Sequence, residues 1–126
     1  MTELEKFSKR WAGVKFMESG SEMGEDGRAM CRSLRRLLTE ACGTIGASVE
    51  KFRTGHYEAY AFVRRSDGSL VFVSFDDFRC RKTDMDACGA VEGVLVRTAE
   101  SVEDYHGGRN TFCSLRGLAA GIECCK

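Results

Sequence analysis

The sequence predicts an α+β domain in which helices cover one face of an antiparallel β-meander of about four strands. Two observations carry this prediction. Apolar residues recur at helical spacing near both ends of the chain, whereas hydrophobicity alternates with a period of two in the middle. A run of strands flanked by helices is typical of folds in which the two kinds of element are segregated. The expected order is ααββββα, in one domain of residues 1–126.

Three segments are expected to be helical. Thr2 and Glu5 stand in capping-box register and start a first helix that ends within residues 17–20. A second helix over residues 28–41 is predicted by apolar residues at intervals of three, four and one. The last helix is expected to begin at about Thr111. Its apolar stripe consists of Phe112, Leu115, Leu118, Ala119 and Ile122.

Strands are expected between the second and the last helix. They cover residues 49–54, 57–65, 70–75 and 93–98. Residues 66–69 predict the tight turn of a hairpin, because Gly68 can take a positive φ at no steric cost. Charge-dense segments without apolar periodicity, residues 19–27 and 76–89, are expected to be loops.

Charge and hydropathy limit the kinds of partner and the location that we expect for this protein. The 19 basic residues balance 19 acidic ones, so no overall field attracts the chain to nucleic acid or to an anionic membrane. No apolar run is long enough to cross a membrane, and no basic start is followed by an apolar stretch with a cleavage site. We therefore expect a cytoplasmic protein that recognises its partner through local patches.

The seven cysteines are expected to be free thiols, because their number is odd, their spacing is irregular and the cytosol is reducing. A structural zinc site usually draws on close pairs of cysteines, and no such pair is present. Nucleophilic catalysis by a cysteine, with His56 or His106 as base, is chemically feasible, but nothing marks one thiol as activated. We expect no catalytic residue, no metal and no cofactor.

Acidic residues gather in the two expected loops. None of them fits the calcium-loop pattern, in which alternating oxygen ligands, a central glycine and a terminal glutamate share one loop. A cation site and an imitation of nucleic-acid phosphate are the alternatives to the solvated loops that we expect. The residues concerned are Glu18, Glu22, Glu25, Asp26, Asp76, Asp77, Asp84 and Asp86.

The most function-like feature of the chain is the segment Tyr105-His106-Gly107-Gly108-Arg109-Asn110. Paired glycines expose backbone N–H groups, and the N-terminus of a helix that follows them carries positive partial charge. With Arg109 beside it, the loop suits a phosphate or a carboxylate. The alternative is a structural turn in which the glycines supply unusual backbone angles and Asn110 caps the last helix.

Four arginines on the second helix form another candidate site. Arg28, Arg32, Arg35 and Arg36 occupy neighbouring positions opposite the leucines. Such an arginine stripe can grip a phosphate backbone or an acidic protein surface. The alternative is the ordinary solvated face of an amphipathic helix.

Aromatic residues alternate along the central hairpin. They are Tyr57, Tyr60, Phe62, Phe72 and Phe75. These rings would form a base-stacking platform if they were exposed and surrounded by basic charge. Alternating aromatic residues on a strand more often belong to a core, and we expect that role here.

Three segments resemble small uncharacterised proteins of bacterial phages and mobile elements. They are the hairpin over residues 60–76, the sequence VLVRTA over residues 94–99 and the sequence DYHGGRN over residues 104–110. Together they cover about the last two-thirds of the chain. Some proteins of this kind inhibit host defence systems, anti-CRISPR proteins among them. The resemblance implies that class of role, in the cytoplasm of the host cell, and carries over no catalytic residue.

The sequence therefore predicts a non-enzymatic binding protein that blocks a host protein or ribonucleoprotein complex, such as a CRISPR–Cas effector, by protein–protein contact. The alternative is a nucleic-acid or nucleotide-binding module that uses the arginine stripe and the Gly-Gly loop. No membrane partner is expected, and the pairing of two copies as a homodimer through a sheet edge stays open. The expected partner surface consists of Arg32, Arg35, Arg36, Tyr105, His106, Gly107, Gly108 and Arg109.

Overall fold

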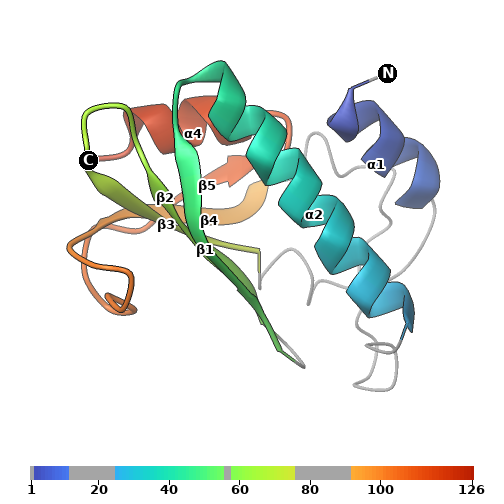
Figure 1. Ribbon diagram of the computed structural model, residues 1–126, viewed down its shortest axis with the longest axis horizontal. Coiled ribbons are helices and arrows are strands. Elements are labelled where there is room, and N and C mark those ends of the chain that lie inside the picture. The colour runs from blue at the N-terminus through green and yellow to red at the C-terminus, as the bar shows by residue number, and fades with distance from the viewer. Residues whose placement is uncertain (1, 12–24, 56–57, 76–91) are drawn as a thin grey trace.

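The computed structural model describes residues 2–11, 25–55, 58–75 and 92–126 (Figure 1). The helices in this part of the chain are α1 (Glu3–Trp11), α2 (Glu25–Thr44) and α4 (Leu118–Cys124). The strands are β1 (Ser48–Thr54), β2 (Ala59–Arg64), β3 (Leu70–Ser74), β4 (Glu92–Ala99) and β5 (Thr111–Ser114). The α+β class predicted from the two hydrophobic periods is confirmed. None of these described helices has the length and apolar character that crossing a membrane requires.

The strands form one antiparallel sheet in chain order, β1-β2-β3-β4-β5. The predicted hairpin turn joins β2 to β3. Arg65 N donates to Ser69 O at 2.8 Å, and Gly68 has a φ of 89°. The Asp67 carboxylate tightens this turn by accepting a hydrogen bond from Ser69 N at 2.9 Å. Antiparallel neighbours can be joined by a short turn, which is what the sequence predicted between β2 and β3.

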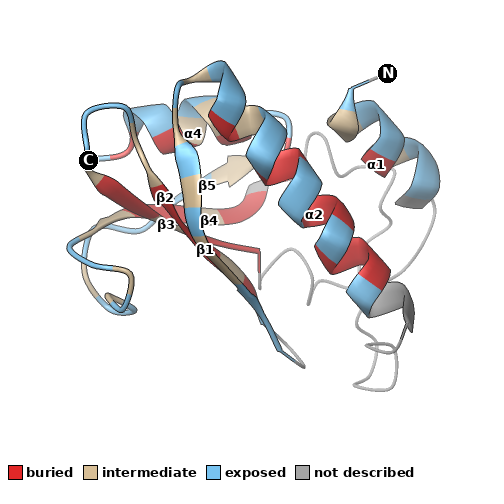
Figure 2. Cartoon of the chain, in the orientation of Figure 1, coloured by how far each residue is buried: buried red, intermediate tan, exposed pale blue. Residues whose placement is uncertain are grey.

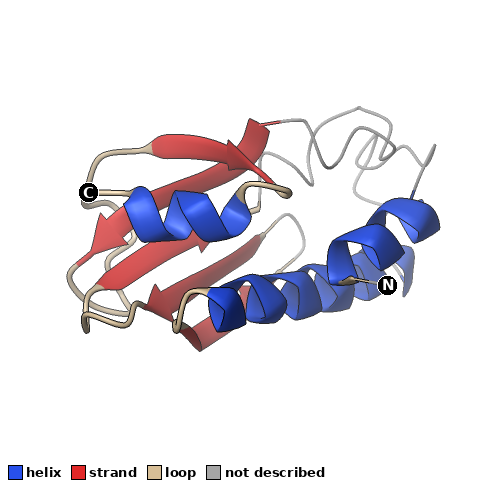
Figure 3. Ribbon diagram, turned by 90° about the horizontal axis from the view of Figure 1, so that it is seen from above, coloured by secondary structure: helices blue, strands red, loops and turns tan. Residues whose placement is uncertain are grey.

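The helices lie on one side of the sheet, as predicted (Figure 3). α2 and α4 pack against the strands, and α1 packs against α2. The apolar stripe of α2 faces inward because its residues recur about every helical turn. The main core contains Phe7, Met30, Leu34, Leu38, Leu118 and Ile122 from the helices and Ala61, Val63, Val71, Val73, Phe75, Val94 and Val96 from the sheet side.

The end of the chain differs from the prediction. Thr111–Ser114, which we expected to open the last helix, is strand β5, and the helix begins at Leu118 instead. Thr111 and Phe112 have high strand propensity, and they pair with Val96 and Leu95 of β4. Thr111 Oγ1 also donates to Val96 O at 2.9 Å. The sheet therefore has five strands rather than about four.

The predicted helix starts are partly right. Thr2 Oγ1 accepts a hydrogen bond from Glu5 N at 3.1 Å, which confirms the cap of the first helix. α2 begins at Glu25, so residues 25–27 are helical rather than part of the expected loop. The predicted end of the first helix and the predicted loop over residues 76–89 lie outside the described residues.

The face of the sheet away from α2 carries a second, smaller aromatic core. Tyr60, Phe62 and Phe72 alternate with the helix-facing residues, so their side chains point to this opposite face. Both central strands are buried along most of their length (Figure 2), which requires cover on each side. The aromatic residues predicted to be core residues thus serve two cores, since Phe75 belongs to the main one. Tyr57 lies outside the described residues.

Arg65 ties the hairpin turn to the end of α4. Its Nε donates to Ser69 Oγ at 2.7 Å. Its Nη1 lies 3.2 Å from Ile122 O, 3.3 Å from Glu123 O and 2.7 Å from Cys125 O. The last carbonyl groups of a helix have no partner within the helix, and a cation there also interacts favourably with the helix dipole. Arg65 therefore fixes α4 against the sheet.

This role predicts different effects for two neighbouring arginines. Replacing Arg65 with Met should lower the free energy of unfolding by about 1–3 kcal/mol, because carbonyl groups at the end of α4 lose their donor. The matched control is Arg64→Met, which breaks the exposed ion pair between Arg64 Nε and Glu50 Oε1 at 2.8 Å and an exposed hydrogen bond from Arg64 Nη1 to Gly68 O at 2.8 Å. A pair of this kind contributes at most about 1 kcal/mol. Urea denaturation of both variants checks the prediction, and equal losses would contradict it.

Candidate functional site

Residues 100–110, which we call the strap, leave β4 and fold over the aromatic face of the sheet. The strap lies on the side of the sheet away from α2 (Figure 1). Its central residue, Tyr105, meets the edges of three rings, with centroid distances of 5.6 Å to Tyr60, 5.6 Å to Phe62 and 6.4 Å to Phe72. Edge-to-face packing of this kind is a favourable arrangement for aromatic rings. The strap thus completes the second core.

The buried side chain of Arg97 anchors the strap. It projects from β4 onto the aromatic face and is only 2% exposed. Its Nη2 donates to Asp104 O at 2.5 Å and its Nη1 donates to Thr98 O at 3.2 Å. The guanidinium also lies 4.4 Å from the centroid of the Phe72 ring. Burial lowers the pKa of Arg97 and the carboxylate of Asp104 opposes this, so the buried charge is compensated rather than isolated.

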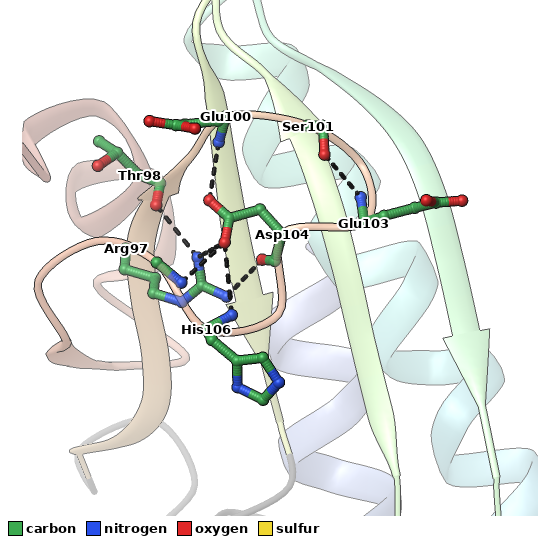
Figure 4. Close-up of polar contacts among 8 residues, drawn as sticks. Arg97, Thr98, Glu100, Ser101, Glu103, Asp104 and His106 are labelled. Atoms are coloured by element: carbon green, nitrogen blue, oxygen red, sulfur yellow. Dashed lines mark hydrogen bonds and ion pairs between the residues drawn. The ribbon is translucent and has the colours of Figure 1, made fainter.

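The carboxylate of Asp104 organises the backbone of the strap (Figure 4). Its Oδ2 accepts a hydrogen bond from Glu100 N at 2.9 Å, and its Oδ1 accepts from Gly107 N at 2.7 Å and from His106 N at 3.4 Å. An ion pair of 3.9 Å joins Oδ1 to Arg97 Nη1. These backbone donors, with a smaller effect of Arg97, hold the pKa of Asp104 below its ordinary value.

The predicted anion site at the Gly-Gly loop is therefore wrong in its simple form. Gly107 N, one of the N–H groups expected to hold an external phosphate, already binds Asp104, as does the neighbouring His106 N. No helix follows the loop directly, because Thr111–Ser114 is a strand and Asn110 caps nothing. The alternative, a structural turn, is correct for its backbone: Gly108 has a φ of 77°. A Cβ at Gly107 would lie 2.6 Å from an oxygen of Asp104, and a Cβ at Gly108 would overlap Thr98 O.

Lys51 holds the strap from the other edge of the sheet. Its Nζ donates to Val102 O at 3.2 Å and to Tyr105 Oη at 3.0 Å. This bond and a second one from Tyr60 lower the pKa of Tyr105, whereas the bond to Tyr105 raises the pKa of Tyr60. Arg97 and Lys51 thus hold the middle of the strap, at residues 102–105, from two different strands.

The side chains that the strap displays remain accessible. Tyr105 is 40% exposed, and His106, Arg109 and Asn110 are exposed as well. The imidazole ring of His106 points away from the Asp104 network (Figure 4). Within the described residues, the side chains of His106 and Arg109 form no hydrogen bond or ion pair. The strap therefore combines a fixed backbone with free recognition groups.

The arginine stripe lies on the other side of the sheet, on α2. Arg32, Arg35 and Arg36 are all exposed, as predicted for the polar face of this helix. Arg36 Nε lies 3.6 Å from Glu3 Oε2, and the guanidinium of Arg35 lies 5.7 Å from the ring centroid of Phe52. A surface pocket of about 400 Å³ beside them is lined by carboxylates as well as arginines. The structure does not bring the stripe and the strap together into one surface.

Thiol and metal chemistry finds little support in the described residues. Burial raises the pKa of Cys42 to about 11 and also raises that of Cys125, which disfavours their reactive thiolate forms. No group of three or more metal-ligating side chains occurs within the part of the chain that the structure describes. His56, Cys80 and Cys88 lie outside it.

No protein-family model, curated protein or solved structure matches the chain. The choice between candidate surfaces therefore depends on their geometry. The strap face is favoured because its backbone is fixed by buried bonds while Tyr105, His106 and Arg109 stay exposed. Tyrosine and arginine are the residue types that most often dominate binding energy.

The sequence alone missed several residues that support the strap. Lys51, Arg97 and Asp104 were not singled out as site residues, although two local signals were present. One was a charged residue, Arg97, inside an apolar strand segment, and the other was the register of Ser101 and Asp104, which resembles a capping box. In the structure Ser101 Oγ accepts from Glu103 N at 3.2 Å, and a turn forms instead of a helix.

The strap geometry makes Gly108 sensitive to substitution. Gly108→Ala should lower the free energy of unfolding by about 1–3 kcal/mol, because an L residue is strained at this φ and its Cβ overlaps Thr98 O. Gly43→Ala is the matched control, since a Cβ there meets nothing within 4 Å and alanine favours the helix by up to about 1 kcal/mol. Urea denaturation of both variants is the measurement, and a neutral Gly108→Ala variant would rule out the strained turn.

Asp104 should contribute a pH-dependent part of the stability. Its pKa is lower in the folded state, so its contribution is present above its unfolded pKa, near about 3.9, and is lost as the pH falls through the folded value. The difference in unfolding free energy between the wild type and Asp104→Asn should be constant from about pH 5 to pH 7 and shrink below about pH 4. A difference that is the same at every pH would contradict the proposed charge on Asp104.

Proposed function

We propose that the protein is a non-enzymatic binding protein that inhibits a host defence complex, such as a CRISPR–Cas effector, by occupying part of its surface. One observation carries this proposal: the strap is fixed by a buried arginine and displays exposed Tyr105, His106 and Arg109. Burying a charge is costly, and the fold retains Arg97 in a place where it shapes a surface loop.

A fixed strap favours binding because little order has to be created on association. Immobilising a mobile loop and its side chains costs free energy that is subtracted from the gain of contact. Here Asp104, Arg97 and Lys51 hold the backbone before any partner arrives. The exposed ring of Tyr105 is itself held by the three rings beneath it. Both features support a role in recognition.

The charges around the strap support a protein partner over nucleic acid. Two basic groups on this face already have partners, since Arg64 pairs with Glu50 and Arg97 pairs with Asp104, whereas Arg109 stays exposed. Lys51 is engaged by the strap itself. Binding to a phosphate backbone needs several cations that are free to replace counterions. A balanced surface with an exposed aromatic residue is better suited to another protein.

The arginine stripe is the feature that still favours the alternative, a nucleic-acid or nucleotide-binding module. Arg32 and Arg35 are exposed on α2, but Glu3 and Glu40 lie among these arginines and reduce the local positive field. The Gly-Gly loop adds less to this alternative, because Asp104 occupies the N–H group of Gly107. The alternative therefore depends on one helix face.

The class of target comes from the resemblance to proteins of phages and mobile elements. Two of the three segments that carry this resemblance, residues 94–99 and 104–110, include Arg97, Asp104 and the two glycines. These are the residues that build the strap. The segments on which the resemblance is based therefore include residues that hold the proposed binding surface.

A phage-plating assay tests the proposal. The protein is produced in bacteria whose CRISPR–Cas system targets a phage, and the efficiency of plaquing is measured. The wild type should restore plaquing, and Tyr105→Ala combined with Arg109→Ala should weaken target binding by at least about tenfold and reduce that restoration. Arg32→Ala combined with Arg35→Ala is the control on the other side of the sheet, and it should behave as the wild type.

Outcomes of this assay separate the hypotheses. If the strap variant protects the phage as well as the wild type does, the strap is not the binding surface. If only the α2 variant loses activity, the nucleic-acid alternative is favoured. Capture of partners from host lysate at low and moderate salt adds an independent criterion, because phosphate contacts weaken steeply with ionic strength.

A further inference from the structure

The two edges of the sheet differ in charge. The β1 edge carries Glu50, Lys51 and Arg53, and its register shifts between Val49 and Lys51, as in a β-bulge. Charges and bulges are the means by which natural sheets prevent edge-to-edge pairing. The β5 edge has no charged side chain within Thr111–Ser114, and the register shift in its pairing with β4 lies on the β4 strand, between Glu92 and Val94. In the described chain, β5 has a pairing neighbour on one side only, which is β4.

The β5 edge also exposes a large apolar side chain. Phe112 is 48% exposed, and it lies on the aromatic face because it pairs with Leu95. Among the described residues, the large hydrophobic side chains that are exposed are Phe112 and Tyr105. Tyr105 has three rings around it, whereas Phe112 makes no aromatic contact within the described residues. An exposed apolar ring beside a sheet edge without charged side chains is a typical site for pairing with another strand.

We infer that this edge binds a second copy of the chain, through antiparallel pairing of β5 with β5 about a two-fold axis. A copy suits the edge because the segment is uncharged on both sides of the contact. The chain as a whole has 19 basic and 19 acidic residues, so two copies do not repel each other over long range. The interface is isologous, and it closes after two subunits instead of growing into a filament.

Sheet geometry fixes the register of this pairing. Antiparallel pairing of identical strands places the two-fold axis perpendicular to the sheet, and residues directly opposite each other point to the same face. Side chains alternate between faces, so one residue of β5 must lie opposite its own copy, with the axis midway between the two. An axis level with a point between two consecutive residues would pair side chains of opposite faces. Centring it on Phe112 sets the two Phe112 rings side by side on the aromatic face. This register buries the most exposed apolar ring of the edge.

The same geometry places both straps on one side of the dimer. A two-fold axis perpendicular to the sheet leaves the two aromatic faces pointing in the same direction. This consequence rests on the proposed function, because it gives the dimer two binding surfaces for a target with repeated subunits. Two linked binding surfaces raise the overall affinity without any new contact.

Sedimentation equilibrium under reducing conditions tests the inference. The wild type should show a reversible monomer–dimer equilibrium in the micromolar range, since a short strand pair forms a small interface. Phe112→Lys should sediment as a monomer at the same concentrations, because it brings two like charges together at the axis. Thr54→Lys, an exposed position on the β1 edge, is the matched control and should dimerise as the wild type does.

A second measurement covers the case in which Phe112→Lys is unfolded. Amide hydrogen exchange in β5 of the wild type should slow as the protein concentration rises, while exchange in β1 should not change.

A wild type that stays monomeric overturns the inference, and so does a dimer that Phe112→Lys leaves intact. Binding of a foreign extended peptide to a monomeric wild type would assign the edge to another partner and also overturn it. A monomer that still restores phage plaquing would overturn the dimer alone, whereas a dimer that restores none would count against the proposed function.

Discussion

The buried guanidinium of Arg97 is the interaction on which the strap after β4 depends. Arg97 lies in the middle of an apolar strand, and at 2% exposure its charge has to be met by acceptors from the protein itself. Phe72 offers a ring face, Thr98 a carbonyl, and Asp104 both a carbonyl and a carboxylate. To supply these groups the chain after β4 must turn back over the sheet. The position of Tyr105, and with it the aromatic core, follows from that turn.

The two faces of the sheet are stabilised by different physical means. The helix side is an ordinary hydrophobic core, in which the residues of α2 and α4 pack on small and branched residues of the strands. The strap side is held by tilted and edge-to-face aromatic rings, a buried charge and hydrogen bonds to backbone carbonyls. Its ordering depends on groups brought together from β1, β2, β3 and β4 at once. The strap is therefore coupled to the whole sheet, although it is a loop.

Local patterns in the sequence predicted those parts of the fold that local interactions determine. The α+β class, the hairpin turn at Gly68 and the Thr2 cap all follow from short-range rules, and they are present in the structure. The helix predicted at Thr111 was wrong because its apolar spacing fits a helix, whereas pairing with β4 decides the outcome. The turn at Gly107 and Gly108 was predicted, but the carboxylate of Asp104, which accepts a hydrogen bond from Gly107 N, was not. Contacts such as the one from Lys51 to Tyr105 join residues 54 positions apart, and no pattern within one segment contains that information.

Different residues of the strap hold its backbone and form its exposed surface, and this separation affects which substitutions the fold tolerates. The residues that hold it in place, Arg97, Asp104 and Gly108, direct their bonds inward, while the side chains of His106 and Arg109 take no part in that framework. Substitutions at the outward positions therefore leave the scaffold intact, in the same way that hypervariable loops of antibodies vary on a constant framework. On the proposed function, changes in a few exposed side chains would be enough to follow an evolving target, without a change of fold.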